Sequence, residues 1–142
     1  MDQLNREQPA SRALELRGAA APLAWSCTYR GQRNLDGSCE VWAEEIRADG
    51  LSETGAHQKS RWPLPLYLGV RNHSPTGFEW GYGGSGPAQL AQALLMDVFG
   101  NREIAQRHYQ DFKHEIVAGW KASWTITVRE IREFVARRNG TP

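Results

Sequence analysis

The sequence predicts an α+β fold in which an antiparallel sheet is covered on one face by helices. Residues with strand periodicity come first along the chain and residues with helical periodicity follow, which favours separate layers over alternating β-α units. A chain of 142 residues suits a single domain, which we place at 23–140. We expect about four strands at 25–30, 39–46, 64–71 and 77–82, followed by three helices at 87–99, 102–118 and 128–138.

The first two strands are predicted as a hairpin. In 25–30 every second residue is apolar, which is the period of a strand with one buried face. Asp36-Gly37 is a good turn signal, and 39–46 follows it as the returning strand. The run Ala43-Glu44-Glu45 favours a helix locally, so the hairpin is predicted mainly from the turn and the first strand.

The next two strands are also predicted from alternation. In 64–71 three leucines and a valine fall on one face. Pro63 and Pro65 lack main-chain N–H donors, so the start of this strand should lie at a sheet edge. In 77–82 three aromatic residues share one face, and we expect them to pack under the first helix.

Local signals place the helix boundaries. Pro87 suits the first position of a helix, where its missing N–H costs nothing, and Gly100 supplies the stop. Asn101 can cap the second helix. Thr127 and Glu130 predict a capping box for the third helix, directly after a short extended piece.

Composition argues against several classes of protein. The net charge of +1 provides no global field toward nucleic acid or a membrane surface, and no apolar stretch approaches the roughly 20 residues that span a bilayer. Cys27 and Cys39 are too few for a disulfide framework and lack zinc spacing, so we expect free thiols in a reducing cytoplasm. Residues 1–22 are predicted to be a disordered tail, and we expect neither a metal nor a cofactor.

The stretch 71–91 is the most tightly specified part of the sequence, and we expect the working surface there. It joins a turn, an aromatic strand and a Gly/Ser loop in front of a helix. Main-chain N–H groups at a helix N-terminus suit an anion, but glycines also permit a tight turn with close packing, and both interpretations stay open. Arg and Trp residues near this stretch suit a partner interface. The candidate ligand- or partner-binding residues are Arg61, Trp62, Arg71, His73, Ser74, Glu79, Gly83, Gly84, Ser85 and Gly86.

An enzyme is the weaker interpretation of these residues. No pair of carboxylates has a recognisable acid–base spacing. Ser85 lies in a pattern that only partly matches a nucleophile elbow, on a chain too short for that hydrolase fold. We therefore assign no catalytic residue, and a small enzyme acting on a nucleotide would have to use His73, Glu79 and Ser85.

Four segments carry a resemblance to a known family. They are Leu64-Pro-Leu66, the stretch Asn72–Ala91 that reads NHSPTGFEWGYGGSGPAQLA, Tyr109-Gln-x-Phe-Lys113 and Trp124-x-Ile-Thr-x-x-x-Ile131. In these segments residues 25–136 resemble a family of small uncharacterised bacterial, phage and plasmid proteins that form a domain of unknown function. The resemblance brings no established mechanism or catalytic residues. It implies an origin in the mobile accessory genome, where small proteins are often counter-defence factors.

We therefore expect a cytoplasmic, non-enzymatic binding module from a phage or plasmid. It would be a counter-defence protein of the anti-CRISPR kind that occludes a host protein, such as a defence complex. The alternative is a binder of a nucleotide or cyclic nucleotide that uses the Gly83–Gly86 loop. No membrane and no direct nucleic-acid contact are expected. A deep pocket holding His73, Glu79 and Ser85 would favour a nucleotide or an enzyme, whereas a charged or aromatic surface would favour a protein partner.

Overall fold

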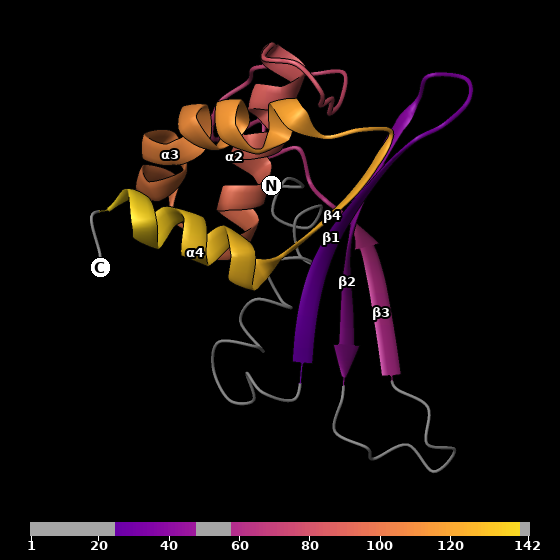
Figure 1. Ribbon diagram of the computed structural model, residues 1–142, viewed down its shortest axis with the longest axis horizontal. Coiled ribbons are helices and arrows are strands. Elements are labelled where there is room, and N and C mark those ends of the chain that lie inside the picture. Colours follow the sequence, from indigo (N-terminus) through magenta and orange to yellow (C-terminus); the bar gives the residue numbers. More distant parts are fainter. Residues whose placement is uncertain (1–24, 48–57, 140–142) are drawn as a thin grey trace.

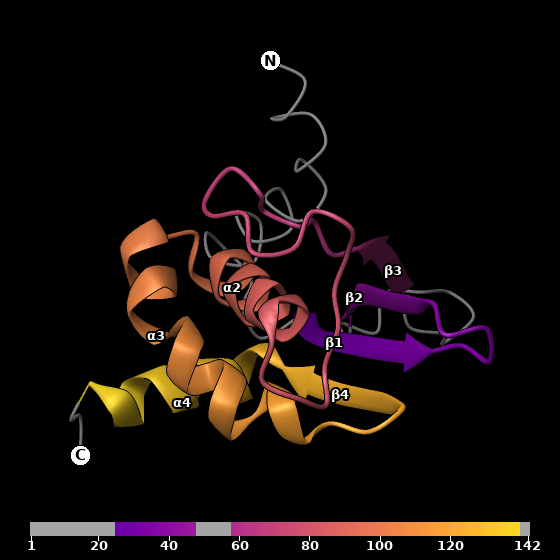
Figure 2. The same cartoon turned by 90° about the horizontal axis from the view of Figure 1, so that it is seen from above.

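The computed structural model describes residues 25–47 and 58–139 and confirms the α+β class (Figure 1). Within these ranges one antiparallel sheet has the order β3-β2-β1-β4, and three α-helices lie on one side of it (Figures 1 and 2). The tail expected at 1–22 lies outside the described residues. The strands are β1 (Trp25–Arg33), β2 (Cys39–Arg47), β3 (Gln58–Pro63) and β4 (Ser123–Thr127).

The β1–β2 hairpin forms as predicted. Its turn uses the positive φ of Gly37, +90°, and the Ser38 N–H donates to the Asp36 carboxylate at 2.9 Å. The register places Cys39 opposite β1 residue Arg33, whereas Cys27 lies six residues away at the other end of β1. Six residues of strand span about 20 Å, far beyond the reach of a disulfide, so the two cysteines do not form a disulfide with one another.

The strands predicted at 64–71 and 77–82 are wrong. Both segments belong to an irregular loop, here called the 64–84 loop, that crosses the central helix and, apart from one hydrogen bond at Leu64, does not pair with the sheet. The third and fourth strands of the sheet are β3 and β4 instead. Because β4 follows two helices along the chain, the expected order of strands before helices is also wrong for this strand. The short extended piece expected before the last helix is β4 itself.

Two glutamines of the central helix explain why 64–71 leaves the sheet. The Gln89 side-chain amide donates to the carbonyls of Leu66 at 2.6 Å and Arg71 at 3.2 Å. Gln92 donates to the Arg71 carbonyl at 3.0 Å and to that of Tyr67 at 3.2 Å. Tyr67 has a φ of +55°, which turns the chain sharply. Side-chain hydrogen bonds therefore take the place of a strand ladder.

The helix predictions hold to within three residues at each end. α2 (Ser85–Phe99) begins two residues early and ends at Gly100, and α4 (Val128–Arg138) matches the prediction with its capping box. α3 (Arg102–Glu115) begins after the cap by Asn101, then gives way to a short 3-10 turn, η1 (Val117–Gly119), where the prediction continued the helix to 118. No helix in the described ranges is long and apolar enough to cross a membrane.

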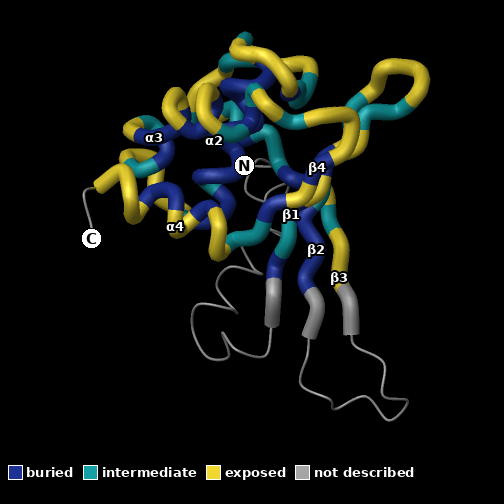
Figure 3. The backbone as a smooth tube through the Cα atoms, viewed as in Figure 1, coloured by how far each residue is buried: buried dark blue, intermediate teal, exposed yellow. Residues whose placement is uncertain are grey.

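The core surrounds α2, which is buried on nearly every side between the sheet and the other helices (Figures 2 and 3). Its Asp97 carboxylate accepts the hydroxyls of Tyr29 at 2.6 Å and Tyr67 at 2.7 Å, which joins β1 and the 64–84 loop to the helix. Trp80 packs in the core at 1% exposure, as expected. Tyr82 does not, since it is 51% exposed.

Candidate functional site

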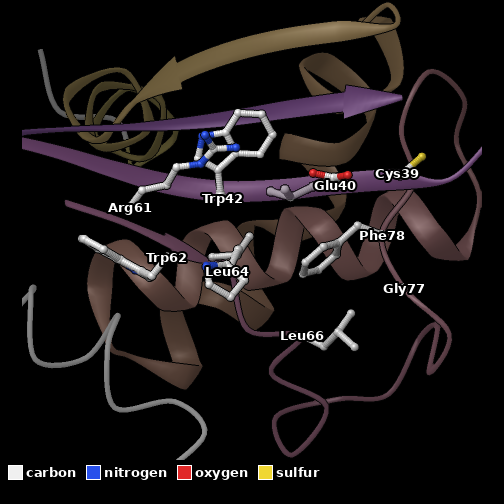
Figure 4. A pocket seen from close by; sticks show the side chains of 11 residues that line it. Cys39, Glu40, Trp42, Arg61, Trp62, Leu64, Leu66, Gly77 and Phe78 are labelled. Carbon is white, nitrogen blue, oxygen red and sulfur yellow. The ribbon is translucent and has the colours of Figure 1, made fainter. Parts of the chain in front are cut away.

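A groove opens where β3 ends, and we call it the β3 groove. Pro63 is the last residue of β3 and lies opposite Trp42 of β2. One more hydrogen bond forms, from the Leu64 N–H to the Val41 carbonyl at 3.1 Å, before the chain turns toward α2. The space left beside β2 has a volume of about 580 Å³. Its inner wall is largely apolar and includes Val41. Leu64, Leu66 and Phe78 also line it (Figure 4).

The outer rim of the β3 groove is a stacked pair of side chains. The Arg61 guanidinium lies over the Trp42 ring, 4.1 Å from its centroid, and Figure 4 shows the two side chains together. The Trp42 indole N–H donates to Glu44 at 2.8 Å, and Glu44 also pairs with Arg30 of β1 at 2.9 Å. These contacts hold the Trp42 ring in place on the sheet face that points away from the helices. Arg61 itself remains exposed.

The inner side of the groove contains an unsatisfied donor. Trp62 follows Arg61 along β3, so its side chain points to the opposite face of the sheet. It is half-buried, and its indole N–H is buried without an acceptor in the described part of the chain. A buried donor without a partner is rare in proteins, so an acceptor supplied by a ligand would stabilise this side chain.

Glu79 lies near one end of the groove and is neutralised by Arg33. The Arg33 guanidinium forms an ion pair with Glu79 and donates to the Trp80 carbonyl at 3.1 Å. Burial opposes ionisation of Glu79, but hydrogen bonds from Arg33 and the Trp80 N–H outweigh it and lower its pKa. Burial, with a smaller effect from Glu79, raises the pKa of the Cys39 thiol, which favours its protonated form.

His73 and Ser74 lie elsewhere, against α2 and α3. Their N–H groups donate to the Gln89 side-chain oxygen at 2.6 and 3.0 Å. The His73 ring packs on Tyr109 with a centroid distance of 4.8 Å, and burial lowers its pKa. The guanidinium of the exposed Arg71 makes a long contact to the Gln106 side chain, at 3.5 Å. These residues fasten the 64–84 loop to the helices, and none of them lines the β3 groove.

The glycines before α2 are explained by close packing. A β-carbon on Gly84 would lie 2.5 Å from the Tyr82 ring, and one on Gly86 would lie 2.7 Å from the Glu79 β-carbon. A β-carbon on Gly83 would meet only the His114 ring, at an ordinary contact distance of 3.6 Å, and Ser85 is exposed. The close packing at Gly84 and Gly86 explains why residues without a side chain stand at the start of α2. This arrangement favours the tight-turn interpretation over an anion site.

The structure thus divides the predicted site residues among three places. Arg61 and Trp62 line the β3 groove, Glu79 contacts Gly86, and His73 with Ser74 binds Gln89. His73, Glu79 and Ser85 share no contact that would join them in one site. In the described ranges, no cluster of His, Cys, Asp and Glu could hold a metal ion.

Sequence reasoning missed the walls of the groove. Val41, Leu66 and Phe78 come from three segments that only the tertiary fold brings together. One local signal was available, since Pro63 and Pro65 are typical of a sheet edge, which is where β3 lies.

Comparisons with known proteins place the chain in a family but give it no activity. The sequence profile of a family of unknown function (DUF6166) matches residues 29–137. The chain belongs to this family. No curated protein and no solved structure showed a significant match.

Proposed function

We propose that this protein is a non-enzymatic binding module that covers a surface of a partner protein with its β3 groove. The observation that carries the proposal is the composition of this groove. An apolar wall lies beside a half-buried Trp62 and a rim formed by Arg61 stacked on Trp42. Tryptophan and arginine in partly desolvated positions supply much of the binding energy of protein interfaces.

The other two functions receive less support from the same geometry. A nucleotide at the Gly83–Gly86 loop would have to enter a closely packed turn, since a β-carbon on Gly84 would lie 2.5 Å from the Tyr82 ring and one on Gly86 2.7 Å from Glu79. An enzyme would need His73, Glu79 and Ser85 together, whereas Glu79 is paired with Arg33 and His73 packs on Tyr109. Proximity of the reacting groups is the first requirement for acid–base catalysis.

A host defence protein is the partner class that we propose. The family resemblance to small phage and plasmid proteins supports a role in counter-defence, in which such a module acts by occluding a CRISPR or other defence component. A protein that works by occlusion needs a binding surface and no catalytic residues, and the β3 groove offers such a surface.

The test combines affinity capture with a matched pair of charge reversals. The full chain, Arg61→Glu and Arg132→Glu are used to capture proteins from a bacterial lysate, and the captured protein is then purified and titrated calorimetrically. Arg132 is an exposed residue of α4, on the other side of the molecule from β3. We expect Arg132→Glu to bind like the wild type and Arg61→Glu to bind at least tenfold more weakly. Equal affinity of all three proteins would contradict the proposal.

A second titration addresses the nucleotide alternative. The wild type is titrated with nucleotides and cyclic nucleotides at millimolar concentration, and we expect no heat of binding. Measurable heat that disappears in Gly84→Val would support the nucleotide binder instead.

A further inference from the structure

The tip of the β1–β2 hairpin carries an exposed leucine. Leu35 lies in the turn between the two strands, and its relative exposure is 109%. Figure 1 shows the turn between β1 and β2 projecting beyond the helices, and Figure 3 shows it as exposed. Because this side chain is fully exposed, it does not enter the β3 groove of its own chain.

Hydrogen bonds hold this tip in one shape. The Asn34 N–H donates to the Ser38 carbonyl at 2.8 Å, and the Gly37 N–H donates to the Asn34 carbonyl at 2.9 Å. The Asp36 carboxylate accepts the Ser38 hydroxyl at 2.6 Å and the Ser38 N–H at 2.9 Å. These two bonds lower the pKa of Asp36, so the tip carries a negative charge beside its leucine. A preorganised tip loses little conformational entropy when it binds.

The β3 groove has properties complementary to those of the tip. Its wall is apolar at Val41, Leu64 and Phe78. Its rim carries the exposed Arg61 guanidinium, which stacks on Trp42. A leucine with a carboxylate beside it matches an apolar wall with a cation beside it. Burial of an exposed leucine favours association, and opposite charges at the edge of the contact fix its orientation.

We propose that the hairpin tip of one copy of this chain inserts Leu35 into the β3 groove of a second copy, with Asp36 against Arg61. This inference goes beyond the proposed function, because it gives the groove an occupant from the chain itself. The contact is smaller than the roughly 1,600 Å² of a stable interface, so the association is weak and depends on concentration. A partner protein bound in the groove would exclude the tip of the second copy.

Analytical ultracentrifugation of the full chain, up to about millimolar concentration, measures this association. We expect the weight-average mass of the wild type to rise with concentration. Leu35→Asp removes the leucine from the tip, and Arg61→Glu reverses the charge of the rim. Each should weaken the association at least tenfold. Arg132→Glu is the control, because it changes an exposed residue of α4 and should associate like the wild type.

A mixture of the two variants tests the pairing of tip and groove directly. Leu35→Asp keeps an intact groove and Arg61→Glu keeps an intact tip, so an equimolar mixture should form dimers that contain one copy of each. Since only folded proteins can pair in this way, the mixed dimer also shows that neither substitution unfolds the chain. A wild type that stays monomeric, association that either variant leaves unchanged, or a mixture that stays monomeric would each overturn the proposal.

These outcomes are separable from the test of the proposed function. If the wild type stays monomeric while binding of the captured partner depends on Arg61, the proposed function stands without this inference. If the copies associate through tip and groove while partner binding does not depend on Arg61, the self-association stands and the proposed function fails.

Discussion

Trp80 shows how one side chain joins three parts of the fold. Its ring packs edge-on against Trp124 with a centroid distance of 5.6 Å, and its indole N–H donates to the Lys121 carbonyl at 2.6 Å. We expect Trp80→Ala to lower the free energy of unfolding by about 3–5 kcal/mol, measured by urea denaturation. Leu35→Ala is the control, because Leu35 is fully exposed and its truncation should change stability by less than about 0.5 kcal/mol. A fully stable Trp80→Ala protein would contradict the assignment.

Gly31 is required by the close approach of a neighbouring strand. A β-carbon there would lie 2.2 Å from the ring of Trp124, which packs across β1. We expect Gly31→Ala to destabilise the fold by about 1–3 kcal/mol, because a buried indole can shift only by disturbing its own neighbours. Gly69 provides the matched control, since nothing lies within 4 Å of its β-carbon position. Thermal denaturation of both variants should separate them, and equal midpoints would argue against this packing.

At the scale of elements, the sequence predicted the features that are set by residues close together in the chain, such as helix boundaries. The cap by Asn101 and the capping box of Thr127 and Glu130 located helices because these signals act within one turn. The segment 64–71 was misjudged because its alternation also suits a loop pressed against a helix. What decides between the two is Gln89 and Gln92, some 20 residues downstream.

Gln89 therefore has a testable role in holding the 64–84 loop. Its side chain is fully buried and makes four hydrogen bonds to main-chain groups of the loop. We expect Gln89→Ala to cost about 2–4 kcal/mol in urea unfolding, because buried N–H and C=O groups lose their partners. Gln110→Ala removes an exposed amide with one contact, to the Tyr109 hydroxyl, and should cost less than about 0.5 kcal/mol. Comparable losses in the two variants would refute this role.

The residues of the candidate site, too, could be predicted only in part from the sequence. Arg61 and Trp62 were predicted because exposed cations and aromatic residues are typical of interfaces, whatever their surroundings. The apolar wall was not predicted, because Val41 and Phe78 are separated by a strand, a loop and two chain reversals. A surface formed by distant segments can be found only after the sheet order is known.

At the scale of the whole molecule, the helices cover one side of the sheet, and the chain leaves the sheet differently at its two edge strands. The β4 edge continues directly into α4, which packs back on the fold (Figure 1). The β3 edge ends early at Pro63, because the next residues are drawn to α2. The interactions that stabilise the core thus also create the opening beside β2.

The stability of the whole fold should also depend on pH through two histidines. Burial, with a smaller effect from Arg107, lowers the pKa of His108, whose Nε2 is buried without a partner in the described residues. Burial likewise lowers the pKa of His73. The unfolded chain, with histidine pKa values near 6.5, therefore binds more protons than the folded chain below that pH. Their contribution to stability is complete above about pH 6.5 and is lost as the pH falls through the folded pKa values.

Urea unfolding between pH 8 and pH 5 measures this dependence before most carboxylates titrate. We expect a constant free energy of unfolding above about pH 6.5 and a decline below it. His108→Gln should reduce the decline, because a neutral amide cannot take up the proton. Gln110→Ala is the control, because it changes an exposed residue without an ionisable group, and it should leave the slope unchanged. A decline of equal slope in His108→Gln and the wild type would show that burial of this imidazole does not set the acid sensitivity.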